Sequence, residues 1–206
     1  MTPSAILALG LACAPNVAPS TLQSIVAQES DGNQLAINLN DGRLMRQPAT
    51  KAEAVMWAAW LRAHGRNFDA GLMQVNSVHW DRLGLTAESI FDPCTNVRSG
   101  GQILTEAYIR AAKQYGPGSR ALLAAISAYN TGSLTRGFHN GYVRNVLKKA
   151  GVNAGVPPID DASRPAARRS LVLTAAMTPP PAAINWQAQP DWSATTVYPA
   201  QPTREP

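Results

Sequence analysis

The sequence predicts a mainly helical α+β domain with one small β-hairpin, followed by a proline-rich tail. Three observations support this fold class. Most apolar residues before Gly151 recur at helical spacing, and only one short stretch alternates apolar and polar residues. Ten of the 16 prolines lie between residues 153 and 206, where no helical or strand period is sustained. We therefore expect a domain at residues 1–152 and an extended or disordered tail at residues 153–206.

The chain begins with a short apolar run, from Ala5 to Ala12, that ends in small residues. Such a run is typical of the apolar part of an export signal, but no Lys or Arg precedes it. The alternative, which we favour, is a first amphipathic helix of the folded domain. No apolar run approaches the roughly 18–20 residues of a membrane-spanning helix, so no membrane span is predicted.

The next helix and the hairpin are predicted from capping and turn signals. Ser20 and Gln23 form a capping box at the start of the helix, and Asp31-Gly32 ends it. Residues 35–39 then alternate toward Asn40-Asp41-Gly42, a hairpin turn signal with another apolar residue beyond it.

Similar signals predict the rest of the domain. Thr50 and Glu53 form a second capping box, and Asp92 followed by Pro93 is a strong helix start. Ser119 is expected to cap a further helix. The four helices predicted in this way cover approximately residues 51–65, 93–116, 119–132 and 142–151.

The net charge of +5 lies in the predicted domain, since residues 1–153 hold 14 Lys/Arg and nine Asp/Glu, whereas the tail holds four of each. A basic domain favours a polyanionic partner, such as nucleic acid, an anionic lipid surface or the bacterial cell wall. The basic residues are mostly scattered singly, without an Arg-rich helix or a stacking platform. Nucleic acid is therefore not expected as a partner.

The two cysteines, Cys13 and Cys94, lie in neither a Cys-x-x-Cys nor a His-clustered arrangement. The sequence therefore predicts no zinc site. Two interpretations remain open at this point: a pair of buried free thiols, or one disulfide that closes a loop of about 80 residues. A disulfide would place the protein outside the cytoplasm.

Glu29 is the candidate catalytic residue. It extends the apolar helix face formed by Leu22, Ile25 and Val26 and lies at the helix C-terminus, where the helix dipole disfavours a carboxylate. Partial burial has the same effect, so we expect a raised pKa. A carboxylic acid that stays protonated near neutral pH can protonate a glycosidic oxygen. The alternative is a glutamate at a frayed helix end that pairs with an arginine.

Two further motifs supply groups that suit a sugar ligand. Residues 69–76 place a glycine beside an apolar pair ahead of Gln74, and residues 128–132 end a helix with Tyr129 and Asn130. Amides and an aromatic face bind N-acetyl sugars by hydrogen bonding and stacking. The sequence contains no nucleophilic triad motif, Gly-rich phosphate loop or metal cluster.

Taken in order, these motifs resemble the soluble lytic transglycosylase (SLT) domain family of the lysozyme-like superfamily. The resemblance covers about residues 10–150 and is most similar to the branch associated with type IV secretion systems. The number of residues between Glu29 and Gln74 is larger than in many members of the family. The residues that carry the resemblance are Glu29-Ser30, Gly71-Leu72-Met73-Gln74, Ala128-Tyr129-Asn130-x-Gly132, Tyr142, Cys13-Ala14-Pro15 and Phe91-Asp92-Pro93-Cys94.

The resemblance implies a goose-type lysozyme fold and cleavage of peptidoglycan between N-acetylmuramic acid and N-acetylglucosamine. Glu29 would protonate the leaving oxygen and then accept the proton of the muramic 6-hydroxyl, whose attack closes a 1,6-anhydro ring. The resemblance also implies a Cys13–Cys94 disulfide, a periplasmic location, and no metal or cofactor. The residues to which it assigns substrate binding are Ser30, Gly71, Met73, Gln74, Asn76, Tyr129, Asn130 and Tyr142.

Three alternatives to this function remain open. A hydrolase would use the same fold and substrate with water as the nucleophile, and a phage-borne wall-degrading enzyme would do so in another context. A wall-binding or assembly protein would need no catalysis. In the tail, Trp186, Trp192 and Tyr198 are candidate docking points for secretion-system components, with a plain tether as the alternative.

Overall fold

The computed structural model describes residues 1–152, so the predicted tail at residues 153–206 lies outside the described residues. The described chain is mainly helical with one small sheet, which confirms the predicted fold class. Its elements in chain order are α1 (Pro3–Cys13), α2 (Pro19–Glu29), β1 (Ile37–Leu39), α3 (Lys51–Ala63), β2 (Phe68–Ala70), β3 (Val75–Asn76), the 3-10 helix η1 (Ser77–His79), α4 (Trp80–Leu83), the 3-10 helix η2 (Ser89–Phe91), α5 (Pro93–Tyr115), α6 (Ser119–Thr131), α7 (Arg136–His139) and α8 (Tyr142–Lys149).

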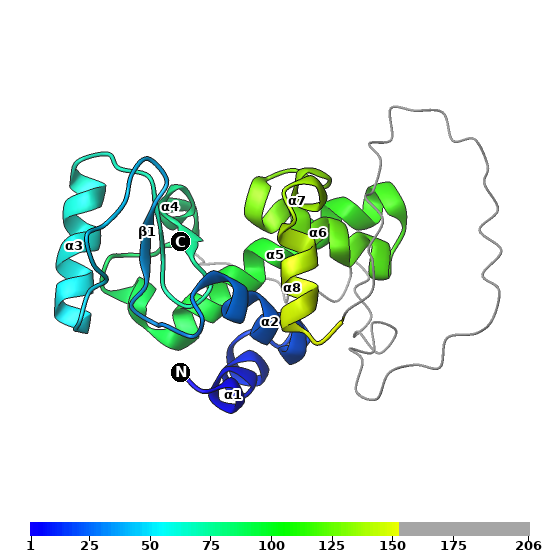
Figure 1. The fold of residues 1–206 in the computed structure, drawn as a ribbon, viewed down its shortest axis with the longest axis horizontal. Helices are drawn as coiled ribbons and strands as arrows, with labels where there is room; N and C mark the ends of the chain where they lie inside the picture. The colour runs from blue at the N-terminus through cyan, green and yellow to red at the C-terminus, as the bar shows by residue number, and fades with distance from the viewer. Residues whose placement is uncertain (153–206) are drawn as a thin grey trace, which may run out of the picture.

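The long helix α5 runs through both halves of the molecule (Figure 1). The sheet lies with α3 and α4 at one end, and α6, α7 and α8 gather at the other, where α6 packs along α5.

The predicted start of α5 is confirmed, because the Asp92 carboxylate accepts a hydrogen bond from the Thr95 N–H at 2.8 Å and Pro93 is the first helical residue. Gly116 follows its last residue with a φ of 80°.

Two of the predicted helix caps are wrong. The helix α2 starts at Pro19, with Ala18 before it, so Ser20 lies inside the first turn and makes no capping box with Gln23. Likewise α6 begins at Ser119 itself, after Gly118, without a side-chain cap. Thr50 caps α3 as predicted, since its hydroxyl accepts from the Glu53 N–H at 3.2 Å. The other half of the predicted capping box is replaced, because the Glu53 carboxylate accepts from the Ala49 N–H at 2.7 Å.

The predicted hairpin across residues 35–44 is wrong, because β1 pairs with a distant partner. The three antiparallel strands follow the order β1-β2-β3, with Ile37 opposite Ala70 and Asp69 opposite Asn76. On the other edge of β1 the side-chain amide of Gln47 replaces a strand, since it accepts from the Ile37 N–H at 2.8 Å and donates to the Ile37 carbonyl at 2.9 Å. The backbone groups of Ile37 are thereby satisfied without a hairpin.

The N-terminal residues pack in the folded domain, as we expected, because α1 contacts α2 and α5. The helix is not amphipathic as predicted, since apolar side chains such as Leu11 also lie on its exposed side. Two small residues allow this packing. A Cβ atom added at Gly10 would lie 3.2 Å from the Leu22 side chain, and one added at Gly101 would lie 2.9 Å from the Ala14 methyl group. Within residues 1–152, no helix combines the length and apolar character that crossing a membrane requires.

The predicted disulfide is confirmed, since Cys13 at the end of α1 is bonded to Cys94 in the first turn of α5. The two Cα atoms are 5.4 Å apart, although 81 residues separate them in sequence. The bond therefore closes a ring of chain that contains α2, the whole sheet and α3.

We expect removal of this bond to lower the free energy of unfolding by at most about 4–5 kcal/mol, because an open loop of this length gains chain entropy when it unfolds. Urea unfolding of the Cys13→Ser, Cys94→Ser variant against the oxidised protein measures the difference. The variant should not respond to reductant, whereas the parent should. Two thiols that alkylate freely in the unreduced parent would contradict the bond.

Candidate active site

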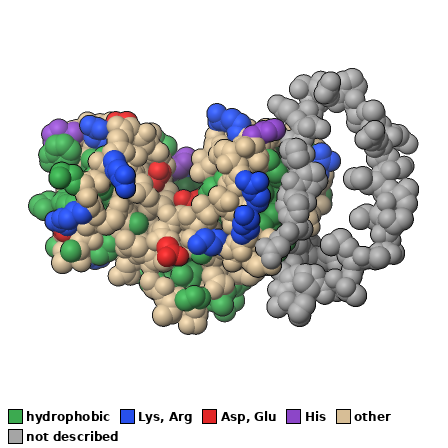
Figure 2. Space-filling view, viewed as in Figure 1, with side chains coloured by type: hydrophobic (Ala, Val, Ile, Leu, Met, Phe, Trp, Pro, Cys, Tyr) green, Lys and Arg blue, Asp and Glu red, His purple; other side chains and the backbone are tan. Residues whose placement is uncertain are grey.

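A cavity of about 550 Å³ lies between the sheet end of the molecule and the end formed by α6. Figure 2 shows the surface hollowed between these two halves, with acidic side chains near the hollow. The cavity takes its lining from α2, the sheet, η1, α4, α5 and α6. Its lining residues are Glu29, Asn40, Asp69, Gln74, Val75, Asn76, His79, Arg82, Ile103, Glu106, Ala107, Arg110, Ala128, Tyr129, Asn130 and Gly132.

Glu29, the last residue of α2, lies in this cavity with its carboxyl group partly buried. Burial raises the pKa of Glu29 to about 7, and the negative charge of Asp69 acts in the same direction. The Tyr142 hydroxyl donates a hydrogen bond to Glu29 Oε1, which favours the carboxylate and lowers the pKa. The predicted raised pKa is confirmed. The arginine-paired alternative is wrong, because Glu29 forms no ion pair with any described residue.

The end of α2 is fixed by its buried face and by Ser30. Leu22, Ile25 and Val26 are fully buried, as the helical spacing predicts. The Ser30 hydroxyl donates to the Leu72 carbonyl at 2.7 Å, which ties the helix end to the segment after β2. Ser30 itself does not line the cavity. Its contact with Leu72 fixes the position of the neighbouring residue, Glu29.

That wall is the segment Gly71–Gln74, and its shape depends on the buried Asn96 of α5. Gly71 has a φ of 80°, and a Cβ atom there would lie only 2.1 Å from Asn96 Nδ2. The Met73 N–H donates to Asn96 Oδ1 at 2.8 Å, while the Met73 carbonyl accepts from the Tyr129 hydroxyl at 2.7 Å. Gly71 and Met73 therefore shape the wall from behind and do not line the cavity.

Gln74 lines the cavity in a left-handed backbone conformation, with a φ of 47°. Its side-chain amide makes three hydrogen bonds within the protein: Nε2 donates to the carbonyls of Gly71 at 2.8 Å and Ala36 at 3.2 Å, and Oε1 accepts from Asn38 at 2.8 Å. These bonds hold a conformation that non-glycine residues rarely adopt. Gln74 is thus a rigid part of the wall.

Asp69 is a second acidic side chain in the cavity, which our sequence analysis did not select. Its neighbours on β2, Phe68 and Ala70, are fully buried, so the strand alternation directs Asp69 to the opposite side. Asn76 donates to its Oδ1 at 2.8 Å and Asn40 to its Oδ2 at 3.0 Å. Burial raises the pKa of Asp69 against the lowering effect of these amides. In the sequence, the alternation of apolar and polar residues in Phe68-Asp69-Ala70 could have predicted a strand with Asp69 on its polar side.

The opposite wall comes from α6, and α8 lies behind Glu29. The Tyr129 hydroxyl donates its hydrogen bond to the Met73 carbonyl. Burial raises the pKa of Tyr129 well above its ordinary value. Asn130 is exposed and accepts from the Asn140 amide at 3.1 Å through Oδ1. Tyr142 opens α8, packs behind the cavity and contacts Glu29 directly; burial also raises its pKa.

The structure therefore separates the predicted site residues into two groups. Five line the cavity: Glu29, Gln74, Asn76, Tyr129 and Asn130. Four lie behind it: Ser30, Gly71, Met73 and Tyr142. Besides Asp69, the side of the cavity formed by η1, α4 and α5 was not predicted from the sequence. Within residues 1–152, no three His, Cys, Asp or Glu side chains cluster as a metal site would require.

The described domain is helical with a small sheet, and its cleft holds a carboxylic acid with a pKa of about 7 beside amide and phenol groups. This arrangement is lysozyme-like. The family model described as the Transglycosylase SLT domain matches residues 7–151. The chain therefore belongs to the SLT transglycosylase family, as the order of its motifs predicted.

Several curated proteins are similar to the same part of the chain. The Type IV secretion system protein virB1 of Brucella abortus is 42% identical over 152 residues, which cover 71% of this chain and 64% of that protein. Protein virB1 of Agrobacterium fabrum is 38% identical over 160 residues, covering 74% and 63%. The match thus spans less than two thirds of the length of these relatives. No solved structure matches the chain at a comparable level of significance.

The raised pKa of Glu29 predicts how stability depends on pH. Because the folded-state pKa is about 7 against an ordinary 4.5, this group contributes stability below pH 4.5 that is lost as pH rises through 7. Glutamine does not titrate, so Glu29→Gln should gain stability relative to the parent over that range, by up to about 3 kcal/mol. Urea unfolding from pH 4.5 to 8 measures the difference. A difference that stays constant with pH would show that the carboxyl group is not desolvated.

Proposed function

We propose that this chain is a lytic transglycosylase, which cleaves the β-1,4 bond between N-acetylmuramic acid and N-acetylglucosamine in peptidoglycan and forms 1,6-anhydro-N-acetylmuramic acid. The observation that carries this proposal is the position of Glu29 in the cavity with a pKa of about 7. Membership of the SLT family supports peptidoglycan as the substrate.

The reaction needs one group that first donates and then accepts a proton. The Glu29 carboxylic acid gives its proton to the glycosidic oxygen while the bond from that oxygen to C1 of the muramic ring breaks. The Glu29 carboxylate then takes the proton of the C6 hydroxyl as O6 bonds to C1. Glu29 ends protonated, and no water is consumed.

The surroundings of Glu29 suit both steps. Because the pKa of Glu29 is raised to about 7, the protonated acid is available near neutral pH and its conjugate base is strong enough to accept a proton. The Tyr142 hydroxyl stabilises the carboxylate between the two transfers, because it already donates to Glu29 Oε1.

The predicted substrate-binding residues take two different roles in this proposal. Asn130 uses only its Oδ1 on Asn140, so its amide N–H groups are available to sugar hydroxyl or N-acetyl groups. Gln74 and Asn76 present an already ordered wall, and the ring of Tyr129 forms the opposite one. Ser30, Gly71, Met73 and Tyr142 position this wall or Glu29 itself.

A muramidase that hydrolyses the same bond is a second candidate, and Asp69 is the observation that favours it. Most glycosidases that use water pair two carboxyl groups, and Glu29 and Asp69 line one cavity. The masses of the products separate the two reactions, since an anhydro end is lighter than a hydrolysed end by one water. A phage-borne enzyme would give the same products, so its genetic context and not its chemistry distinguishes it.

We further propose that the chain acts in the periplasm, where it opens the cell wall locally for the assembly of a type IV secretion or conjugation system. The relative from Brucella abortus is named as a type IV secretion system protein, and the Cys13–Cys94 disulfide suits an oxidising compartment. The alternative is an assembly role without catalysis. Secretion that continues with a folded Glu29→Gln variant would favour that alternative.

Glu29→Gln should lower the turnover of peptidoglycan by about 10²–10⁴-fold, because the amide keeps the shape of the side chain but cannot transfer the proton. Release of soluble fragments from purified peptidoglycan, analysed by mass spectrometry, measures turnover and product type together. Glu88→Gln is the matched control, since Glu88 is exposed and does not line the cavity. Release near the parental rate by a folded Glu29→Gln variant would refute the assignment.

We propose that residues 153–206 act as a separate tail, which either docks secretion-system components or serves as a tether. Truncation after residue 155 should then leave the melting temperature and the rate of glycan cleavage nearly unchanged. Thermal unfolding and the release assay on the truncated and full chains test this. A large fall in melting temperature would place the domain boundary further along the chain.

A further inference from the structure

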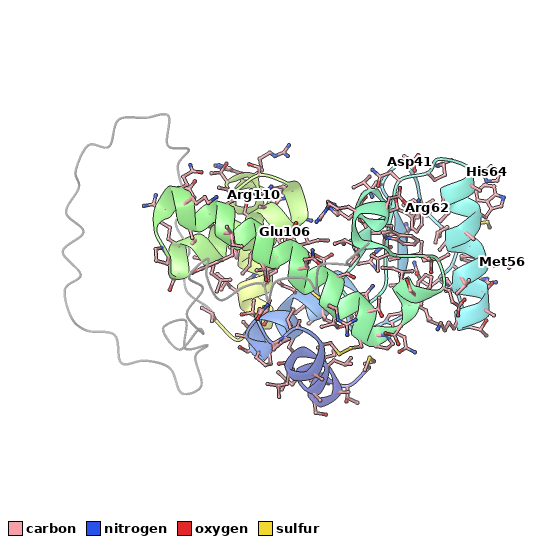
Figure 3. All side chains as sticks on the ribbon, turned by 180° about the vertical axis from the view of Figure 1, so that it is seen from behind. Asp41, Met56, Arg62, His64, Glu106 and Arg110 are labelled. Atoms are coloured by element: carbon pink, nitrogen blue, oxygen red, sulfur yellow. A yellow bond between two sulfur atoms is a disulfide. The ribbon has the colours of Figure 1, made fainter. Side chains whose placement is uncertain are left out.

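The side of the cavity formed by η1, α4 and α5 carries charges that the proposed proton transfer does not use. His79 and Arg82 reach it from η1 and α4. Glu106 and Arg110 extend from α5, as Figure 3 shows from behind. One face of α5 supplies the rest of this wall, at the spacing of successive helical turns: Ile103, Glu106, Ala107 and Arg110.

Two of these charges neutralise each other. Arg82 Nη1 donates to Glu106 Oε1 at 2.8 Å, and Gln102 donates to the same oxygen at 3.1 Å. The carboxylate one turn before Arg110 on α5 is therefore already occupied. Burial and the neighbouring Arg82 lower the pKa of His79 against the raising effect of Glu106 and Asp69, which disfavours the charged imidazole.

Arg110 differs from Arg82 because it forms no ion pair with any residue in the described part of the chain. It is exposed, it lines the same cavity as Glu29, and its positive charge is not matched by a carboxylate. A guanidinium in a ligand cavity presents a planar set of N–H donors that suits a carboxylate better than it suits a neutral sugar hydroxyl.

We propose that Arg110 binds a carboxylate carried on the lactyl arm of the muramic acid residue, and so makes the enzyme sensitive to the state of that arm. The proposal rests on peptidoglycan being the substrate. The carboxylate has two possible sources in this polymer. In strands that carry stem peptides it is a carboxylate of the peptide, and in strands that have lost them it is the free lactyl carboxylate.

The test compares Arg110→Gln with Lys113→Gln in the full chain. Lys113 is the matched control, because it is an exposed cation on α5 that does not line the cavity. Three ligands separate the sources: glycan strands with stem peptides, amidase-treated strands with free lactyl carboxylates, and a neutral chitooligosaccharide. For the two glycans kcat and KM are measured, and in a Glu29→Gln background Kd is measured for all three.

Arg110→Gln should weaken binding by about 3- to 10-fold for at least one of the charged ligands, through KM and not kcat. The effect should shrink at about 0.5 M NaCl, and chitooligosaccharide binding should not change. A loss confined to strands with stems identifies a peptide carboxylate, and a loss confined to stripped strands identifies the lactyl carboxylate. Lys113→Gln should bind all three ligands like the parent.

Three results would overturn the proposal: no loss on either charged ligand, an equal loss on the neutral one, or the same loss in Lys113→Gln. Failure of the proposed function gives a different pattern. In that case the parent would release no fragments from either glycan, while the Kd values in the Glu29→Gln background would still decide whether Arg110 binds the carboxylate.

Discussion

The shape of the candidate active-site cleft depends on the hydrogen bonds of one buried side-chain amide, that of Asn96. It donates to the carbonyls of Ala70 at 2.9 Å and Ile90 at 3.0 Å and accepts from the Met73 N–H at 2.8 Å. Loss of the amide would remove all three of these hydrogen bonds, and each buried backbone group left without another partner would cost about 1–3 kcal/mol. The absence of a side chain at Gly71 is what allows the amide to approach so closely.

The segment Gly71–Gln74 connects the Asn96 amide to the end of the helix that carries Glu29, the proposed catalytic acid. Ser30 at the end of α2 binds the carbonyl of Leu72, and Tyr129 of α6 binds that of Met73. The segment Gly71–Gln74 therefore fixes the relative positions of α2, α5 and α6 around the cavity. The burial that raises the pKa of Glu29 results from this packing, so the chemistry of the acid is a property of the whole arrangement.

Local signals in the sequence predicted the helices and Glu29 well, because caps and helical spacing involve neighbours within one or two turns. Asp92 and Thr50 cap their helices as expected, and Glu29 extends a buried helix face. The partner of β1 was not predictable in this way, because the strand has only three residues and pairs about 30 residues further on. Arg110 was missed for the same reason, since only tertiary packing brings α5 to the cavity.

The disulfide divides the candidate active site into residues inside its covalent ring and residues outside it. Glu29 and the Gly71–Gln74 wall lie inside the covalent ring from Cys13 to Cys94, whereas Tyr129 and Tyr142 lie outside it. The two cysteines form a single disulfide, so packing and hydrogen bonds hold the helices that carry the two tyrosines against this ring. Loss of that packing would expose Glu29 to water and return its pKa toward the ordinary value of 4.5. The raised pKa of Glu29 therefore depends on noncovalent contacts made by helices outside the ring.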